Sequence, residues 1–270
     1  MKIASVCRVL PTPDNPAAGA FVLRRLSAMA GKAQLRIIQP VPHLPLVRPL
    51  PAWACEPAHV SSGVTIEHAP MTYLPGLLKS LDGRWLEASV LPRLAALQAA
   101  GELDLIDAHF GYPDGVGCVR AARRLGIPAF VTLRGMEVDA IRHPRIGPQL
   151  TEALRHADGC ITVSHSLRDL ALEAGVDADR LLVAPNAVDR VSFRPGDRAA
   201  ARARLGLEPD APLIVSVGYL IAGKGHGILI RALAQLRETR PDARLAIVGG
   251  PGYEPDHPRV LAEIARETGV

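Results

Sequence analysis

The most informative stretch of the chain is a glycine loop that carries a lysine. An apolar, β-branched run, Leu213–Val217, ends at Gly218, and Gly223-Lys224-Gly225 then leads into an amphipathic pattern. A strand, a glycine turn and a helix N-terminus predict an anion site, because free backbone N–H groups and the positive end of the helix dipole face the same point. Lys224 would add a full positive charge, which suits a phosphate. The stretch therefore predicts a phosphorylated ligand.

Two other interpretations of this loop stay open. Gly218, Gly223 and Lys224 fit the front of a P-loop, but Gly225 stands where a Ser or Thr hydroxyl would hold Mg²⁺. The next apolar run, Arg244–Val248, also ends without an acidic residue for a metal. The other alternative is a glycine turn with an exposed lysine and no ligand. Lysine is rare in this chain, at positions 2, 32, 79 and 224 only, which favours a role for Lys224.

Further candidate residues follow the ends of predicted strands. His109 ends the run Leu103–His109, and ligands of open α/β sheets bind beyond the carboxyl ends of strands. A histidine there can hydrogen-bond a hydroxyl, or it can cap the next helix as a structural residue. Arg134 and Glu137 follow another strand end and would point toward the same crevice. Arg134 could pair with a phosphate or with Glu137.

Gly19 and Ser164 fit the starts of helices. Gly19 opens the first helical pattern and would let a backbone approach a ligand closely, although a plain loop glycine is equally consistent. No G-x-G-x-x-G follows the first strand, so NAD and FAD are not expected. Ser164 fits the N-cap of a helix over 165–174, and ligand contact is its second interpretation.

The elements that must position these residues alternate regularly along the chain. Helical patterns such as 21–29 and 86–100 separate short apolar runs, which predicts α/β folding with parallel sheets covered on both faces. Residues 40–63 are crowded with prolines and are predicted to be one long irregular loop. The predicted strands are Ile3–Val9, Leu35–Gln39, Val64–His68, Leu103–His109, Ala129–Leu133, Cys160–Ser164, Leu181–Ala184, Leu213–Val217 and Arg244–Val248.

A turn-rich segment after the seventh predicted strand, at residues 185–196, indicates a domain boundary. We expect an N-terminal Rossmann-like domain over 1–190, a linker over 191–208 and a second domain over 209–270. The second domain holds only two predicted strands, which are too few to close a core. It is therefore expected to be incomplete.

The composition limits which binding partners and which cellular location we expect. The net charge is +4 without a run of like charges, so no nucleic-acid partner is indicated. The four cysteines show no C-x-x-C spacing, which predicts neither a zinc site nor a disulfide framework and favours a cytoplasmic location. No apolar stretch is long enough to span a bilayer, and peripheral contact with the inner face of the membrane stays open.

In their order and spacing, several of these segments resemble the family 4 glycosyltransferases. The resemblance runs through nearly the whole chain. The matching segments are Gly19-Ala-Phe, His109-Phe-Gly-Tyr-Pro, Val131-Thr-Leu-Arg-Gly, Ile161-Thr-Val-Ser-His, Val183-Ala-Pro-Asn and Val215–His226.

The resemblance implies a GT-B fold, in which two Rossmann-like domains face a cleft. It implies transfer of a sugar from a UDP- or GDP-sugar to a glycan or lipid-linked acceptor, with retention of configuration, in cell-surface polysaccharide or glycolipid synthesis. The nucleotide-sugar would be a co-substrate, with no metal and no other cofactor. Lys224 would hold the donor diphosphate in the loop of Gly218, Tyr219 and Gly225, Gly19 would close over the same phosphates, and His109 would contact the donor sugar.

The sequence departs from this family's pattern in several places. Tyr219 stands where the family commonly has arginine, and Arg134-Gly135 replaces a histidine-glycine pair. The family's paired glutamates, which bind donor sugar and ribose, would lie beyond residue 270. The alternatives are therefore a truncated, non-catalytic remnant or binding module, and a GT-B nucleotide-sugar epimerase.

Overall fold

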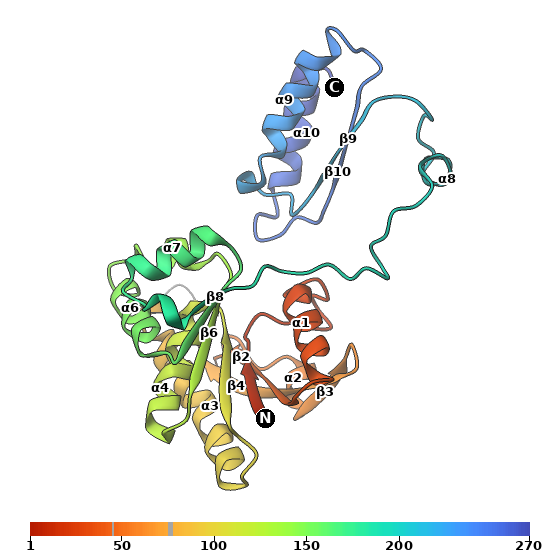
Figure 1. The fold of residues 1–270 in the computed structure, drawn as a ribbon. Coiled ribbons are helices and arrows are strands. Elements are labelled where there is room, and N and C mark those ends of the chain that lie inside the picture. Colours follow the sequence, from red (N-terminus) through yellow and green to blue (C-terminus); the bar gives the residue numbers. More distant parts are fainter. Residues whose placement is uncertain (45, 75–77) are drawn as a thin grey trace. The chain divides into compact units, whose positions relative to one another are not determined.

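The computed structural model describes residues 1–44, 46–74 and 78–270, which form two compact units, Met1–Ala187 and Val188–Val270 (Figure 1). The strands are β1 Lys2–Val6, β2 Gln34–His43, β3 Ala58–Ser61, β4 Val64–Thr72, β5 Leu105–His109, β6 Ala129–Leu133, β7 Gly159–Thr162, β8 Leu181–Val183, β9 Leu213–Val217 and β10 Arg244–Val248. The helices are α1 Ala20–Ala30, α2 Ala52–Cys55, α3 Asp82–Ala99, α4 Val116–Leu125, α5 Glu137–Ala140, α6 Gly147–His156, α7 His165–Glu173, α8 Arg198–Arg204, α9 His226–Arg237 and α10 His257–Thr268. Short helical turns, η1 Lys79–Leu81, η2 Gly111–Gly115, η3 Ala178–Arg180 and η4 Ala222–Lys224, lie between them.

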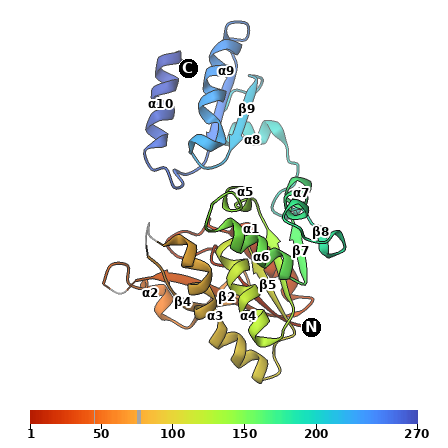
Figure 2. The same cartoon turned by 90° about the vertical axis from the view of Figure 1, so that its left-hand side faces the viewer.

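The first unit is built on one eight-stranded sheet in the order β3-β4-β2-β1-β5-β6-β7-β8. Every neighbouring pair is parallel except β3 and β4. Helices cover both faces, with α1 on one and α3, α4 and α6 on the other (Figures 1 and 2). Adjacent residues of β2 contact opposite faces of the sheet, because successive side chains of a strand point to opposite faces. Ile37 packs with α1, and Ile38 packs in the hydrophobic cluster that contains α3, α4 and α6. The α/β prediction is confirmed.

The prediction of one irregular loop over 40–63 is wrong. β2 continues through Pro40 and Pro42 to His43. The Ile38 carbonyl accepts from Cys7 on the β1 side, and the His43 carbonyl accepts from Tyr73 on the β4 side. Alternate residues bond to the same side, so both prolines face the side of β1, which has ended at Val6. Pro40 has no N–H to continue this ladder beyond the bond from Cys7, so pairing with β1 ends there, while β2 continues through its pairing with β4 on the other side.

The same segment also contains the short helix α2 and the strand β3. β3 pairs with β4 across a two-residue turn, in which Ser62 and Gly63 both have positive φ, 50° and 77°. Positive φ at both central positions matches the right-handed twist of the strands, as in a type I′ hairpin. The apolar residue Val60 is 74% exposed, as expected at the outer edge of the sheet.

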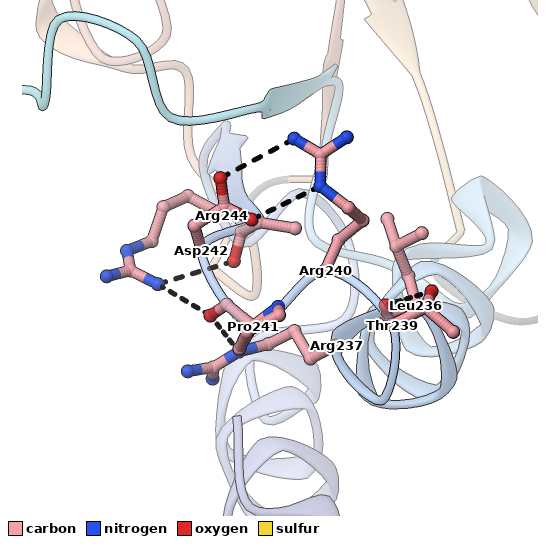
Figure 3. A network of polar contacts seen from close by, with 8 residues as sticks. Leu236, Arg237, Thr239, Arg240, Pro241, Asp242 and Arg244 are labelled. Carbon is pink, nitrogen blue, oxygen red and sulfur yellow. Dashed lines mark hydrogen bonds and ion pairs between the residues drawn. The ribbon is translucent and has the colours of Figure 1, made fainter.

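The second unit contains α8, the parallel pair β9 and β10, and the helices α9 and α10, which pack against each other. Both predicted strands, Leu213–Val217 and Arg244–Val248, are confirmed with the predicted bounds. Side chains of the α9–β10 connection hold the turn (Figure 3): Arg240 pairs with Asp242 at 3.4 Å, and Arg237 donates to the Pro241 carbonyl at 3.3 Å. Within the described residues, no helix is long and apolar enough to cross a membrane.

Candidate functional site

A buried chain of polar side chains crosses the carboxyl ends of three neighbouring strands in the first unit. Ser5 of β1 donates to the Asp107 carboxylate of β5 at 2.9 Å. The same carboxylate lies 3.2 Å from Nε2 of His109, which is fully buried. On the other side of the ring, Nδ1 of His109 lies 3.1 Å from the guanidinium of Arg134, which follows β6. The sheet register therefore brings two predicted site residues, His109 and Arg134, into contact.

This contact determines the tautomer of His109. A guanidinium can only donate, so Nδ1 must accept and the ring proton must reside on Nε2, facing Asp107. The Nε2–Asp107 contact is short but is not aligned as a hydrogen bond. Burial would raise the pKa of Asp107, but the neighbouring His109 and the hydroxyl of Ser5 outweigh it and lower that pKa. Asp107 and His109 are two residues apart on one strand, and this spacing in the sequence could have revealed the pair.

The Arg134 guanidinium is held from several sides. It donates to the Asn186 side chain at 3.1 Å and lies 5.3 Å from the centre of the Phe21 ring. Burial, followed by the nearby charge of Arg25, lowers the pKa of Arg134. Its Nε has no hydrogen-bond partner among the described residues. Glu137, one of the two partners expected for this side chain, accepts from the backbone of Arg134 and not from its guanidinium.

Glu137 instead binds backbone. One carboxylate oxygen accepts from the N–H of Gly111 at 2.7 Å, and the other accepts from Arg134 at 3.0 Å and Gly135 at 2.7 Å. The side chain is buried. Glu137 therefore joins the loop after β5 to the loop after β6, and it holds the backbone that carries His109 and Arg134.

Gly19 and Ser164 both lie at helix starts, as predicted. Gly19 precedes α1 with φ 60°, and a Cβ there would lie 1.9 Å from the Val9 carbonyl oxygen, so only glycine fits. Ser164 is the N-cap of α7 and accepts from the N–H of Leu167 at 3.3 Å. Phe110, next to His109, has φ 73°, a strained value for a residue with a side chain.

Asp114, in the turn η2, lies in the candidate site but was not predicted from the sequence motifs. It is fully buried, and this burial, opposed by the charge of Arg8, raises the pKa of Asp114 to about 6. Its Oδ1 accepts from the backbone N–H of Arg8 at 2.6 Å, and the Arg8 side chain lies 4.0 Å from Oδ2. A buried carboxyl with a raised pKa at the carboxyl edge of a sheet is typical of functional sites.

The second unit presents the predicted anion loop at the carboxyl end of β9. Lys224 is exposed, and its aliphatic stem lies over Gly218, where a Cβ would be 3.5 Å from Cδ of the lysine. Among the described residues, none pairs with the Lys224 ammonium. Gly225 precedes α9 with φ 72°. Tyr219 is 40% exposed beside this loop.

Two residues that the sequence reading did not assign hold this loop in place. His226 is buried, with Nδ1 3.1 Å from the Ser216 hydroxyl of β9 and Nε2 3.1 Å from the Tyr219 carbonyl. Gly249 follows β10, and a Cβ there would lie 1.7 Å from the Gly218 carbonyl oxygen. The strand ends of β9 and β10 are thus fastened together beneath Lys224.

A hollow of about 770 Å³ lies at the amino ends of β1 and β2, lined by Lys2, Gln34, Arg36 and Glu67 among others. None of the candidate residues lines it, and parallel sheets bind ligands at the opposite edge. We therefore do not assign it to the site. The described parts of the chain contain no group of three or more His, Cys, Asp or Glu side chains placed to hold a metal.

Comparisons with known proteins show which family the chain belongs to. A family model described as Glycosyltransferase Family 4 matches residues 56–191, about half of the chain. A second model, described as Glycosyl transferases group 1, matches residues 197–270.

Individual relatives point the same way. The D-inositol 3-phosphate glycosyltransferase of Stackebrandtia nassauensis is 31% identical over 229 residues, which cover 78% of this chain and 51% of that protein. The corresponding protein of Nocardia farcinica is 32% identical over 215 residues, covering 72% and 47%. The crystal structure of Anabaena Alr3699/HepE in complex with UDP and glucose covers 100% of this chain and 67% of its own, with a TM-score of 0.70 and 20% identity. This chain spans about half the length of the curated relatives it matches.

Proposed function

Because the chain belongs to glycosyltransferase family 4, we propose that it transfers a sugar from a UDP- or GDP-sugar to an acceptor hydroxyl. The observation that carries this proposal is the exposed Lys224, whose stem lies over Gly218 just before α9 and whose ammonium pairs with no described residue. The leaving group of such a reaction is a nucleoside diphosphate. A fixed cation and the amides of a helix start would stabilise the charge that develops on it.

The first unit would supply the residues around the donor sugar. The Nδ1 atom of His109 already accepts from Arg134, and Nε2 faces Asp107. A sugar hydroxyl that binds His109 must therefore displace the Arg134 contact, whereas Arg134 can donate to a hydroxyl directly. We assign Arg134 as the residue that positions His109, and Asp107 as the group that keeps the ring proton on Nε2.

We further propose the stereochemistry, the acceptor class and the cellular location that the resemblance implies. The sugar is transferred with retention and without a metal, because Lys224 and the helix start take the place of a divalent cation at the diphosphate. The acceptor is a glycan or a lipid-linked molecule, and the protein works in the cytoplasm, at the inner face of the membrane. The relatives named for D-inositol 3-phosphate favour an acceptor with several hydroxyls.

A transfer assay with radiolabelled UDP- and GDP-sugars tests this proposal. We expect labelled product whose anomeric configuration, read by NMR, equals that of the donor. Arg134→Met should lower kcat by roughly tenfold or more, the loss of one charge-assisted hydrogen bond, and leave UDP binding intact. The exposed Arg142→Met is the matched control.

Three results would contradict the proposal. UDP binding without transfer to any acceptor indicates a non-catalytic binding module. Reversible isomerisation of the donor without acceptor indicates an epimerase. Inverted product overturns the stereochemistry.

A further inference from the structure

The Lys224 loop, residues 218–225, is packed against the segment that follows β10. The N–H of Leu220 donates to the Gly250 carbonyl at 2.7 Å. Gly252 approaches the loop so closely that a Cβ on it would lie 3.1 Å from Cβ of Tyr219. The shape of the loop before α9 therefore depends on the connection between β10 and α10.

One side chain of this connection bonds directly to the loop. Oε2 of Glu254 accepts from the N–H of Ala222 at 3.0 Å, and Nδ1 of His257 lies 3.7 Å from the same oxygen. The Glu254 side chain is 35% exposed. Among the described residues, no other side chain accepts from an amide of the Lys224 loop. Glu254 therefore ties the backbone two residues before Lys224 to the connection that leads into α10.

The charge of this carboxylate does not favour an anion in the loop. The ammonium of Lys224 pairs with no described residue, so Glu254 does not neutralise it. A carboxylate close to a diphosphate repels it. Any favourable effect of Glu254 on nucleotide binding must therefore come from its hydrogen bond to Ala222. Glutamine keeps an acceptor for this bond and removes the charge, so it separates the two effects.

The amides that remain for a phosphate lie next to the bonded one. The N–H groups of Gly223, His226 and Gly227 have no hydrogen-bond partner among the described residues. A Cβ on Gly223 would meet no atom within 4 Å, so the loop is open there. His226 and Gly227 begin α9, where the helix dipole favours an anion. The bond from Ala222 to Glu254 fixes the turn η4, from which these amides follow.

We propose that Glu254 is a positioning residue for the donor diphosphate. Its carboxylate holds the N–H of Ala222, and this bond keeps Lys224 and the free amides in place before the nucleotide binds. The inference rests on the proposed function for the diphosphate, whereas the ordering of the loop by Glu254 does not. A loop that is already ordered loses less entropy on binding, so loss of the bond should weaken the nucleotide.

Calorimetry on the full chain with UDP and GDP tests this role, using Glu254→Ala and Glu254→Gln. We expect Glu254→Ala to weaken the preferred nucleotide roughly fivefold, the effect of one hydrogen bond. Glu254→Gln should bind at least as tightly as the wild type, because it keeps the acceptor and removes the repulsion. Glu263→Ala is the matched control. Glu263 is an exposed residue of α10 that pairs with Arg259 at 3.9 Å, and its variant should bind like the wild type.

Hydrogen exchange of the nucleotide-free protein measures the loop itself. Exchange at residues 222–225 should be faster in Glu254→Ala than in the wild type and in Glu254→Gln, while the amides of β9 and β10 keep their protection. Loss of protection throughout both strands would overturn the inference, because Glu254 would then stabilise the second unit as a whole.

The binding results separate this inference from the proposed function. If the wild type binds a nucleotide and Glu254→Ala binds it equally well, the role of Glu254 alone is contradicted. Equal weakening by Glu254→Gln and Glu254→Ala also contradicts it, because the hydrogen bond would not be the cause. If the wild type binds neither UDP nor GDP, the proposed function fails, and with it the role at the diphosphate. Faster exchange in Glu254→Ala alone would then still support the ordering of the loop.

Discussion

His109 is the central residue of the candidate site in the first unit, because both of its ring nitrogens contact other side chains. Arg134 takes Nδ1, and Asp107 faces Nε2. These partners are themselves anchored, Asp107 by the Ser5 hydroxyl and the Arg134 backbone by Glu137. Each side chain is thus oriented by another, which is what precise placement of a reacting group requires.

Asp114 provides a test of the electrostatics at this scale. A carboxyl whose pKa is raised by folding binds more protons in the folded than in the unfolded state. It therefore lowers the free energy of unfolding as pH rises from about 4 through about 6. We expect Asp114→Asn to stabilise the protein at about pH 7 by up to about 3 kcal/mol, because the amide oxygen still accepts from Arg8. The gain should shrink near pH 5. Urea denaturation at both pH values measures it.

The control is Asp158→Asn, in which an exposed carboxylate also accepts a backbone N–H, from Ala129. It should give no comparable gain. A destabilised Asp114→Asn at about pH 7 would show that the ion pair with Arg8 outweighs the burial of the charge.

Among the elements, the β3–β4 hairpin carries a second set of paired rings. The Nδ1 of His68 is 2.7 Å from the Glu56 carbonyl and must donate to it, so Nε2 accepts from Nδ1 of His59 at 2.7 Å. The two rings stack at 4.9 Å, and Trp53 of α2 packs edge-on to both. The hairpin and α2 thus share one small cluster of aromatic rings.

This cluster predicts a hairpin that loosens in acid. Burial, followed by the charge of His68, lowers the pKa of His59. The unfolded chain then binds more protons just below the ordinary histidine value of about 6.5, so stability falls as pH drops through it. We expect β3 amides to lose hydrogen-exchange protection between about pH 7.5 and 5.5, after correction for intrinsic rates.

His59→Gln keeps a donor for His68 and should make this loss less steep, while β5 amides serve as the unaffected reference. Equal pH dependence in His59→Gln and wild type would show that the ring contacts do not control the hairpin.

The sequence predicted best those strands whose bounds do not depend on a neighbouring strand. Leu213–Val217, Arg244–Val248 and Ala129–Leu133 match in full. The failure over 40–63 has a local cause: a proline interrupts a ladder only on the side that its N–H would face, and β2 continues because β4 pairs with its other side. Likewise, Ser5 lies in β1, Asp107 in β5 and Arg134 directly after β6, and only the sheet register brings them to His109.

At the scale of the whole molecule, the proposed chemistry is divided between two units. The first holds His109 and Arg134, and the second holds the Lys224 loop. Loops at strand ends carry the candidate residues in each unit, as expected for parallel sheets. The second unit has a small sheet, in which Val215 and Val217 are 55% and 77% exposed. The Lys224 loop is held in place by the local contacts of His226 and Gly249 rather than by a large core.

The central claim is that the Lys224 loop binds the donor diphosphate. Calorimetric titration of the full chain with UDP and GDP tests it most directly, using Lys224→Ala and, as a matched control, the exposed Lys32→Ala. The account predicts that Lys224→Ala weakens the preferred nucleotide by about tenfold or more, as expected for a charge-assisted contact, while Lys32→Ala binds like the wild type. Equal affinities of Lys224→Ala and the wild type would contradict it.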